Sequence, residues 1–309
     1  TLVRECQQRI RKGSKSFAGA AMLFPADIRD DTYLLYAWCR YCDDLIDGQE
    51  FGRVPTETAA EHGDSPSVRL EQLQHQTREA LQGRATEPVF LALQRVVQKH
   101  RIADVHPMDH LEGFAMDARR RKFVDLNDTL EYCYHVAGVV GVMMALIMGV
   151  RDRDVLHRAS DLGIAFQLTN IARDVLDDAA DGRVYLPEQW LDDHRIPPDD
   201  LTAEVYRQDL ALVVRRLLDE ADKYYKSADV GISHLPRRCA WAIDSAKRIY
   251  RDIGTNVRHR KDRAWDERVY VPGSGKMVFV FRSLAATLFS SGPRENSSEY
   301  GRDELWTKS

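Results

Sequence analysis

The stretch CRYCDDLID, residues 39–47, places acidic side chains on an otherwise apolar, helix-compatible segment. At about 100° of turn per residue, three polar side chains lie within about 60° of Asp43, namely Tyr36, Arg40 and Asp47. Most of the remaining circumference is apolar, and a helix of this kind is normally buried. We therefore expect the polar stripe to face a cavity or a partner, the alternative being a solvated acidic surface.

A second stripe runs along QLTNIARDVLDD, residues 167–178. At helical spacing, four side chains share about 80° of arc: Gln167, Asn170, Asp174 and Asp178. More than half of the rest of this segment is apolar. Burying the carboxylates of both stripes without partners would cost several kcal/mol each, and too few lysines or arginines share these faces to neutralise them. The two stripes therefore predict a divalent metal site.

The ligand types narrow the choice of metal. Carboxylate and amide oxygens suit Mg²⁺, or alternatively Mn²⁺, and neither stripe offers His or Cys in a ligand pattern. Because Mg²⁺ is typically held by one or two carboxylates together with substrate phosphates, the acids indicate a phosphorylated substrate. Arg40 can grip a phosphate through its planar guanidinium group. A prenyl diphosphate would join such a charged head to an apolar cavity.

The longest apolar run is VAGVVGVMMALIMGV, residues 136–150. It is shorter than the roughly 20 residues that span a bilayer, so we expect a buried helix. Gly138 and Gly141 permit close approach of a neighbouring element, and the helix could line a channel for a prenyl tail. On the sequence alone, a packed core helix is the simpler interpretation.

Composition and missing motifs exclude several function classes. A formal net charge of −4 argues against nucleic acid as a partner. No GxGxxG or GxSxG motif is present, which disfavours a bound nicotinamide cofactor and serine-hydrolase chemistry. Five cysteines, an odd number, argue against a disulfide framework and for a reducing compartment. We interpret the CxxC of Cys39 and Cys42 as core residues.

Helical periodicity covers most of the chain and predicts an all-α fold. The expected helices span residues 26–48, 67–83, 88–101, 108–121, 128–149, 152–178, 203–230 and 235–257. The segment at 276–289 alternates like a strand at its start, but its length favours a last helix. We expect one domain over residues 1–290 and a flexible tail over 291–309, which is rich in Gly, Ser, Glu and Arg.

With these elements in place, long stretches of the chain resemble the squalene and phytoene synthases, and within that family the bacterial phytoene synthases most closely. The stretches that carry the resemblance are GSKSF (13–17), LLYAWCRYCDDLID (34–47), YCYHVAGVVG (132–141), QLTNIARDVLDDAADGRVYLP (167–187), AWAIDSAKRIYRDIG (240–254) and RAWDERVYV (263–271). The resemblance implies an isoprenoid-synthase-type helical bundle with a central apolar cavity.

The resemblance also implies metal ligands. Asp43 and Asp47 match the first metal-binding DxxxD of the family, while Asn170, Asp174 and Asp178 match the second. Both segments can also be read as DDxxD, which brings in Asp44, Asp177 and Asp181. The acids alone therefore leave the register open.

Further substrate contacts follow from the same resemblance. Arg40 and Gln167 correspond to diphosphate contacts, and Tyr36 would line the same site. Tyr132 is similar to the tyrosine near the reacting carbons, where an aromatic face or hydroxyl can steady a cation or a moving proton. The remaining implied pocket positions are the flap residues Ser14, Lys15 and Ser16, together with Tyr250 and Arg268.

The implied reaction is the Mg²⁺-dependent head-to-head condensation of two geranylgeranyl diphosphates, through a cyclopropyl diphosphate, to phytoene in carotenoid biosynthesis. No NADPH is expected. The alternatives are squalene or dehydrosqualene synthesis from farnesyl diphosphate, a non-catalytic lipid-binding relative and a purely structural helical domain. We expect a cytoplasmic protein that contacts the inner face of the cell membrane peripherally, through the basic run 237–263, and that meets downstream carotenoid enzymes.

Overall fold

The structure is a computed structural model that describes residues 21–47, 65–267, 269, 280, 283 and 301–308. Every regular element in this part of the chain is helical, which confirms the predicted all-α class. The longer helices are α3 (Ala26–Asp47), α4 (Pro66–Leu81), α5 (Pro88–His100), α6 (Val105–Ala118), α7 (Leu126–Cys133), α8 (Val139–Ile147), α9 (Arg153–Ala180), α11 (Arg207–Ser233) and α12 (Arg237–Arg260). The short ones are the π turn η2 (Tyr134–Gly138), α10 (Glu188–Asp193), η3 (Pro198–Asp200), η4 (Glu204–Tyr206) and η5 (Lys261–Arg263).

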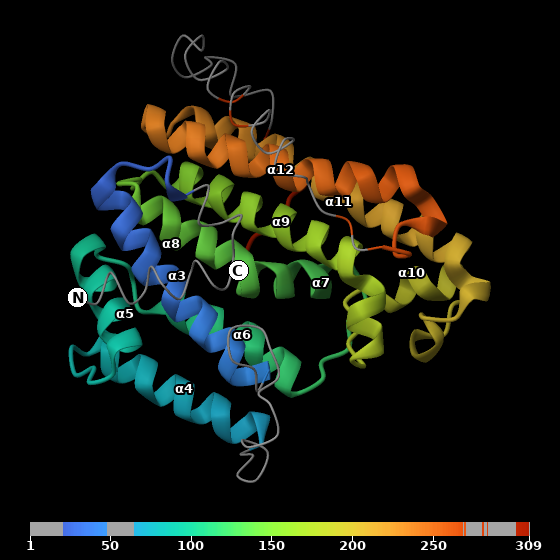
Figure 1. The fold of residues 1–309 in the computed structure, drawn as a ribbon, viewed down its shortest axis with the longest axis horizontal. Coiled ribbons are helices and arrows are strands. Elements are labelled where there is room, and N and C mark those ends of the chain that lie inside the picture. The colour runs from blue at the N-terminus through green and yellow to red at the C-terminus, as the bar shows by residue number, and fades with distance from the viewer. Residues whose placement is uncertain are drawn as a thin grey trace.

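Helix α9 runs through the middle of the molecule and packs against α8, α11 and α12 (Figure 1). Figure 1 shows α11 and α12 along one side and α4 on the opposite side. One core cluster joins α7, α9, α10 and α11, and a second joins α3, α4, α5, α6 and α8. The second stripe lies on this central helix, which explains why its side chains are half-buried.

The predicted helix over 128–149 is one continuous helical run, α7–η2–α8, interrupted by the π turn at Tyr134–Gly138. Glycines bring this run against α9, because a Cβ on Gly163 would lie 2.2 Å from the Ala137 carbonyl oxygen. A Cβ on Gly141 would likewise lie 2.3 Å from the Ala159 carbonyl oxygen. Single π turns often occur at functional sites. Here the turn contains Val136 and Ala137, which line the cavity described below.

The run Leu126–Ile147 is long and apolar enough to cross a membrane, but 67% of its most apolar window is buried inside the protein. It contacts α6 and α9. The expectation of a buried core helix therefore agrees with its packing.

Local sequence signals set several helix ends. Ser65 caps α4 and accepts from the backbone N–H of Val68, and Pro66 occupies the first turn. Asp152 caps α9 in the same way through the N–H of Val155. At the other end of α9, Gly182 adopts a φ of +72°, which suits a residue without a Cβ. The ends of α9 are thus fixed by its own residues, which sets where its acids lie.

The C-terminal segment 301–308, which belongs to the tail predicted to be flexible, makes polar contacts with the helices. Arg302 makes two 2.7 Å hydrogen bonds to Asp161, and the N–H of Trp306 donates to the hydroxyl of Tyr224 at 3.1 Å. Lys308 forms an ion pair with Asp109. The buried carboxylate of Asp161 thereby gains a charged partner from this segment, in addition to the hydroxyl of Ser227. The predicted boundary at 290 falls among residues that the structure does not describe.

Candidate active site

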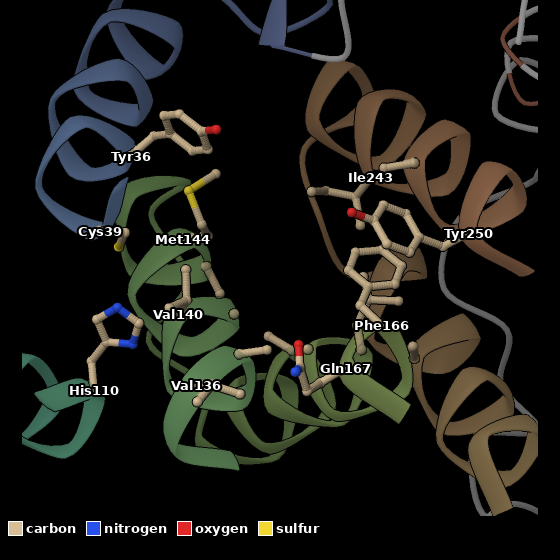
Figure 2. A pocket seen from close by; sticks show the side chains of 18 of the residues that line it. Tyr36, Cys39, His110, Val136, Val140, Met144, Phe166, Gln167, Ile243 and Tyr250 are labelled. Atoms are coloured by element: carbon tan, nitrogen blue, oxygen red, sulfur yellow. The ribbon is translucent and has the colours of Figure 1, made fainter. Parts of the chain in front are cut away.

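A cavity of about 500 Å³ lies between α3, α6, α7–α8, α9, α11 and α12. Its walls are mainly apolar, as Figure 2 shows for Val136, Val140 and Met144 on one side and Ile243 on the other. The charged and amide side chains in the lining are Arg40, Asp43, Asp117, Arg158, Gln167 and Arg183. All of these except Arg158 come from the last turns of α3 and α6, the middle of α9 and the loop after it. The cavity therefore joins an apolar body to a charged region.

The first stripe lies on the last turns of α3 and reaches the cavity. Tyr36, Arg40 and Asp43 all line it. Arg40 pairs with Asp44 at 2.7 Å and with Asp43 at 3.3 Å, and the Asp43 side chain is 51% exposed against 16% for Asp44. Asp43 is thus the more accessible acid for a bound cation or substrate.

Some predicted positions lie beyond what the structure describes. Asp47 is the last residue of α3, but its side chain is outside the described set. The same holds for the flap residues and the pocket arginine predicted from the resemblance, which are Ser14, Lys15, Ser16 and Arg268. Their roles stay predictions.

The acids of the second stripe are half-buried on α9, beyond Gln167, the residue of the stripe that lines the cavity. Asp174 pairs with Arg173, whose Nε donates at 2.8 Å. Burial, reinforced by the nearby carboxylate of Asp174, raises the pKa of Asp178 to about 7. By contrast, Asp177 and Asp181 are exposed. Asn170, Asp174 and Asp178 are thus the partly buried members of this segment, and the choice between the two registers stays a prediction.

The donor set of this stripe fits a divalent cation. Asn170 Oδ1 is buried without a hydrogen-bond partner among the described residues, one turn from Asp174. The raised pKa of Asp178 shows that burial and the nearby Asp174 disfavour its ionised form, and a bound cation would stabilise that ionised form. Within the described residues, no three His, Cys, Asp or Glu side chains already form a metal-binding group. The chemistry of the stripe thus supports a cation site, and the individual ligands stay predictions.

A pair of aromatic rings forms another wall of the cavity. Phe166 and Tyr250 stack with ring centroids 4.3 Å apart, and Gln167 lies next to them (Figure 2). Gln167 also accepts a hydrogen bond from the Asn170 amide at 3.4 Å. The structure thereby brings the predicted Gln167 and Tyr250 together on the side opposite Tyr36.

Tyr132 lines the cavity as predicted, but its surroundings include residues that sequence reasoning missed. Its hydroxyl donates to Asp117 at 3.0 Å, and its ring stacks on Tyr185. Burial raises the pKa of Tyr132 well above its ordinary value, so its hydroxyl stays protonated. Arg183, two residues before Tyr185, also lines the cavity. Arg183 and Tyr185 belong to the stretch GRVYLP, residues 182–187, which is one of the stretches that carry the family resemblance. That stretch was the sequence signal for these two residues. No sequence pattern singled out Asp117 as a site residue.

Comparison with solved structures defines the class. A dehydrosqualene synthase crystallised with a ligand superposes with a TM-score of 0.80 at 28% identity, covering 92% of this chain and 96% of that one. A squalene synthase from Alicyclobacillus acidocaldarius shares the fold with a TM-score of 0.74 at 23% identity, covering 84% and 94%. The helical bundle therefore has the isoprenoid-synthase-type fold.

Sequence comparison gives the family. The squalene/phytoene synthase family model matches residues 10–274. The 15-cis-phytoene synthase of Pantoea ananas is 47% identical over 94% of this chain and 93% of its own length. The 15-cis-phytoene synthase of a Paracoccus species is 50% identical over 99% and 98%. The chain belongs to the squalene/phytoene synthase family, as the sequence motifs predicted, and is an enzyme of the prenyltransferase type.

Proposed function

We propose that this enzyme is a phytoene synthase, which condenses two geranylgeranyl diphosphates head to head, through a cyclopropyl diphosphate, to phytoene. The observation that carries the proposal is the apolar cavity joined to the charged region formed by the last turns of α3 and α6, the middle of α9 and the loop after it. Near-full-length identity of 47–50% to phytoene synthases supports the choice of product. The reaction needs no reductant, so NADPH is not required.

The charged region binds and orients the diphosphate. Arg40 and Arg183 line it and can donate charge-assisted hydrogen bonds to phosphate oxygens, and Gln167 adds an amide donor. Four carboxylates and one amide oxygen would hold a divalent cation, which we propose to be Mg²⁺. The carboxylates are those of Asp43, Asp47, Asp174 and Asp178, and the amide oxygen is Oδ1 of Asn170, which has no hydrogen-bond partner among the described residues. When bound, the cation would neutralise charge on the leaving diphosphate. Asn170 and the acids thus contribute oxygens, and the arginines contribute fixed positive charge.

The apolar body excludes water and carries the cationic stages of the reaction. The Phe166–Tyr250 and Tyr132–Tyr185 ring pairs line it, and the faces of aromatic rings attract cations. A carbocation held among apolar side chains such as Val140 is kept from quenching by water. Ionisation at the charged region and carbon–carbon bond formation in the apolar body are thereby kept adjacent.

Dehydrosqualene or squalene synthesis from farnesyl diphosphate is the second candidate. The likeness to a dehydrosqualene synthase structure supports it. The two candidates share the charged region and differ in the length of tail that the apolar body accepts.

The test is to incubate the purified enzyme with geranylgeranyl diphosphate and Mg²⁺, without NADPH, and to chromatograph the hexane extract with ultraviolet detection. We expect a phytoene triene peak that disappears with EDTA. Hydrocarbon from farnesyl diphosphate alone would establish the second candidate instead. No product from either substrate would refute both and favour a non-catalytic, lipid-binding relative.

Two variants on α9 test the cation stripe within this assay. We expect Asp174→Ala to abolish hydrocarbon formation while the protein stays folded, because it removes a half-buried acid of the stripe. Asp177→Ala, on the exposed side of the same helix, is the matched control and should remain active. Full activity in Asp174→Ala would overturn the assignment of Asp174 to the cation site.

Because the product is a hydrocarbon, we further propose that the protein contacts anionic membrane lipid peripherally at the inner face of the cell membrane. Arg237 and Arg238 are exposed at the start of α12. Further along the basic run, Arg251 and Arg258 are paired with Asp222, so the start of the helix offers the more available charge. Flotation with anionic and neutral vesicles tests this, and equal recovery with both would contradict it.

A further inference from the structure

Asp117 is an acid at the cavity that belongs to neither stripe. It lies in the last turn of α6 and lines the cavity. Its two carboxylate oxygens accept from two different tyrosines, Oδ2 from the hydroxyl of Tyr132 at 3.0 Å and Oδ1 from the hydroxyl of Tyr185 at 2.9 Å. One carboxylate therefore joins side chains that lie 15 and 68 residues away along the chain.

The two tyrosine rings that share this carboxylate are held as a unit. They are nearly parallel, with centroids 4.6 Å apart and an interplanar angle of 18°. Phe123 packs against both rings, edge-on to Tyr132 at 5.4 Å and tilted against Tyr185 at 5.6 Å. The hydroxyl of Thr129 donates to the backbone carbonyl of Tyr185 at 2.9 Å. Little freedom remains for either ring.

Hydrogen-bond direction limits what these hydroxyls can do next. A tyrosine hydroxyl has one proton to donate, and a carboxylate can only accept. With both protons committed to Asp117, neither hydroxyl donates to a diphosphate. What they offer the cavity is the ring faces and the oxygen lone pairs, and the charge of Asp117 adds electron density through the hydrogen bond.

We propose that Asp117 is a positioning residue, which fixes Tyr132 and Tyr185 as an electron-rich stacked pair on the cavity wall to stabilise the cationic stages of the condensation. This inference rests on the proposed function, because it concerns how the same cavity handles carbocations. Asp117 acts through the two tyrosines rather than on the substrate. Its loss should therefore slow turnover without weakening diphosphate binding.

The molecule contains a matched control for this arrangement. Asp109, also on α6, accepts from the hydroxyl of Tyr134 at 3.0 Å. Neither of these two described residues lines the cavity. The same Asp–Tyr pair thus occurs twice along α6, about two turns apart, once at the cavity and once away from it.

The experiment compares Asp117→Asn, Tyr132→Phe and the double variant with Asp109→Asn and Tyr134→Phe. We expect Asp117→Asn to lower kcat about 10- to 100-fold, the rate equivalent of one hydrogen bond to a charged group. KM for geranylgeranyl diphosphate should change less than about threefold, since Arg40 and Gln167 remain. The double variant should be no slower than the slower single variant, because Asp117 acts through Tyr132.

The control variants should keep kcat close to that of the wild type even where they lower the melting temperature. Asp117→Glu keeps the charge and should recover part of the lost rate. The inference is overturned if Asp117→Asn leaves kcat unchanged, if its effect is fully additive with Tyr132→Phe, or if Asp109→Asn lowers kcat equally. Failure of the wild type to form any hydrocarbon would refute the proposed function instead, so the two failures are distinguishable.

Discussion

Helix α9 carries acids in two contrasting settings. In its first half, Asp161 is 0% exposed, and its oxygens accept two bonds from Arg302 and one from Ser227. In its last turn, Asp178 lies near other acids, and burial together with Asp174 raises its pKa to about 7. One acid is satisfied by the protein itself, and the other is held in a setting that disfavours its charge.

The contrast separates a structural acid from a functional one. An acid that the fold has fully paired contributes to the packing of α9 and has nothing left to offer a ligand. An acid destabilised by neighbouring acids gains from a cation, so its environment favours binding at the expense of stability. On this helix, burial alone does not distinguish the structural acid, Asp161, from the functional one, Asp178. The charged groups around each acid do distinguish them.

The largest effect that would sharpen this contrast is on catalysis. Asp178→Asn keeps the shape of the side chain and removes its charge, so we expect hydrocarbon formation to fall about 1,000-fold, or about 4 kcal/mol. The measurement is kcat with saturating geranylgeranyl diphosphate and Mg²⁺. Turnover within threefold of the wild type would show that Asp178 does not serve the reaction.

The next effect is on stability. Arg302→Ala leaves Asp161 buried without its cation, which should lower the free energy of unfolding by about 3–5 kcal/mol. Urea unfolding followed by circular dichroism measures it. Arg302→Lys keeps the charge but not the pair of hydrogen bonds to Asp161, so it should lower the free energy of unfolding by less than Arg302→Ala does. A loss below about 1 kcal/mol in Arg302→Ala would mean that the C-terminal segment does not hold Asp161 in solution.

The pH dependence should reveal the unsatisfied acid. The pKa of Asp178 is about 7 in the folded enzyme and about 4 when unfolded, so its contribution to stability is present below about pH 4 and is lost as pH rises through 7. In EDTA, the free energy of unfolding of the wild type should therefore fall by up to about 2–4 kcal/mol relative to that of Asp178→Asn between pH 4 and pH 8. Denaturant unfolding at several pH values tests this. A constant difference across that range would contradict it.

The smallest effect belongs to an exposed ion pair. Arg251 is 45% exposed and pairs with Asp222 at 3.2 Å. Because such pairs are screened by water, Arg251→Ala should change the free energy of unfolding by less than about 1 kcal/mol and leave turnover unaltered. A loss as large as that of Arg302→Ala would show that exposure does not separate the two kinds of pair.

The sequence predicted the parts of this site that depend on local periodicity. The expected helix over 26–48 matches α3, Ala26–Asp47, and Tyr36, Arg40 and Asp43 share a face that does reach the cavity. Gln167, which the spacing of the second stripe singled out, lines it as well. Spacing along one helix fixes which side chains share a face, so a single sequence is sufficient for these four residues. Tyr132 and Tyr250 also line the cavity, but the family resemblance, and not the spacing, implied them.

Contacts between distant segments could not be predicted in this way. Asp117 precedes the basic run of residues 119–122, so the sequence suggests that it lies on the surface. Only the packing of α6 against distant segments places Tyr132 and Tyr185 within hydrogen-bonding distance of it. Arg302 lies 141 residues from Asp161, in a stretch whose composition suggests a loose tail. In both cases the partner is set by tertiary packing, which no local pattern encodes.

The most direct test of the contrast on α9 is thermal unfolding of two neutral variants in EDTA at pH 7.5, with wild type alongside. Asp161→Asn should melt below the wild type, because Arg302 loses its charged partner. Asp178→Asn should melt above it, because the variant relieves an acid held among acids. Opposite shifts would establish that one helix carries a structural acid and a functional one, and a lower melting temperature in both variants would contradict it.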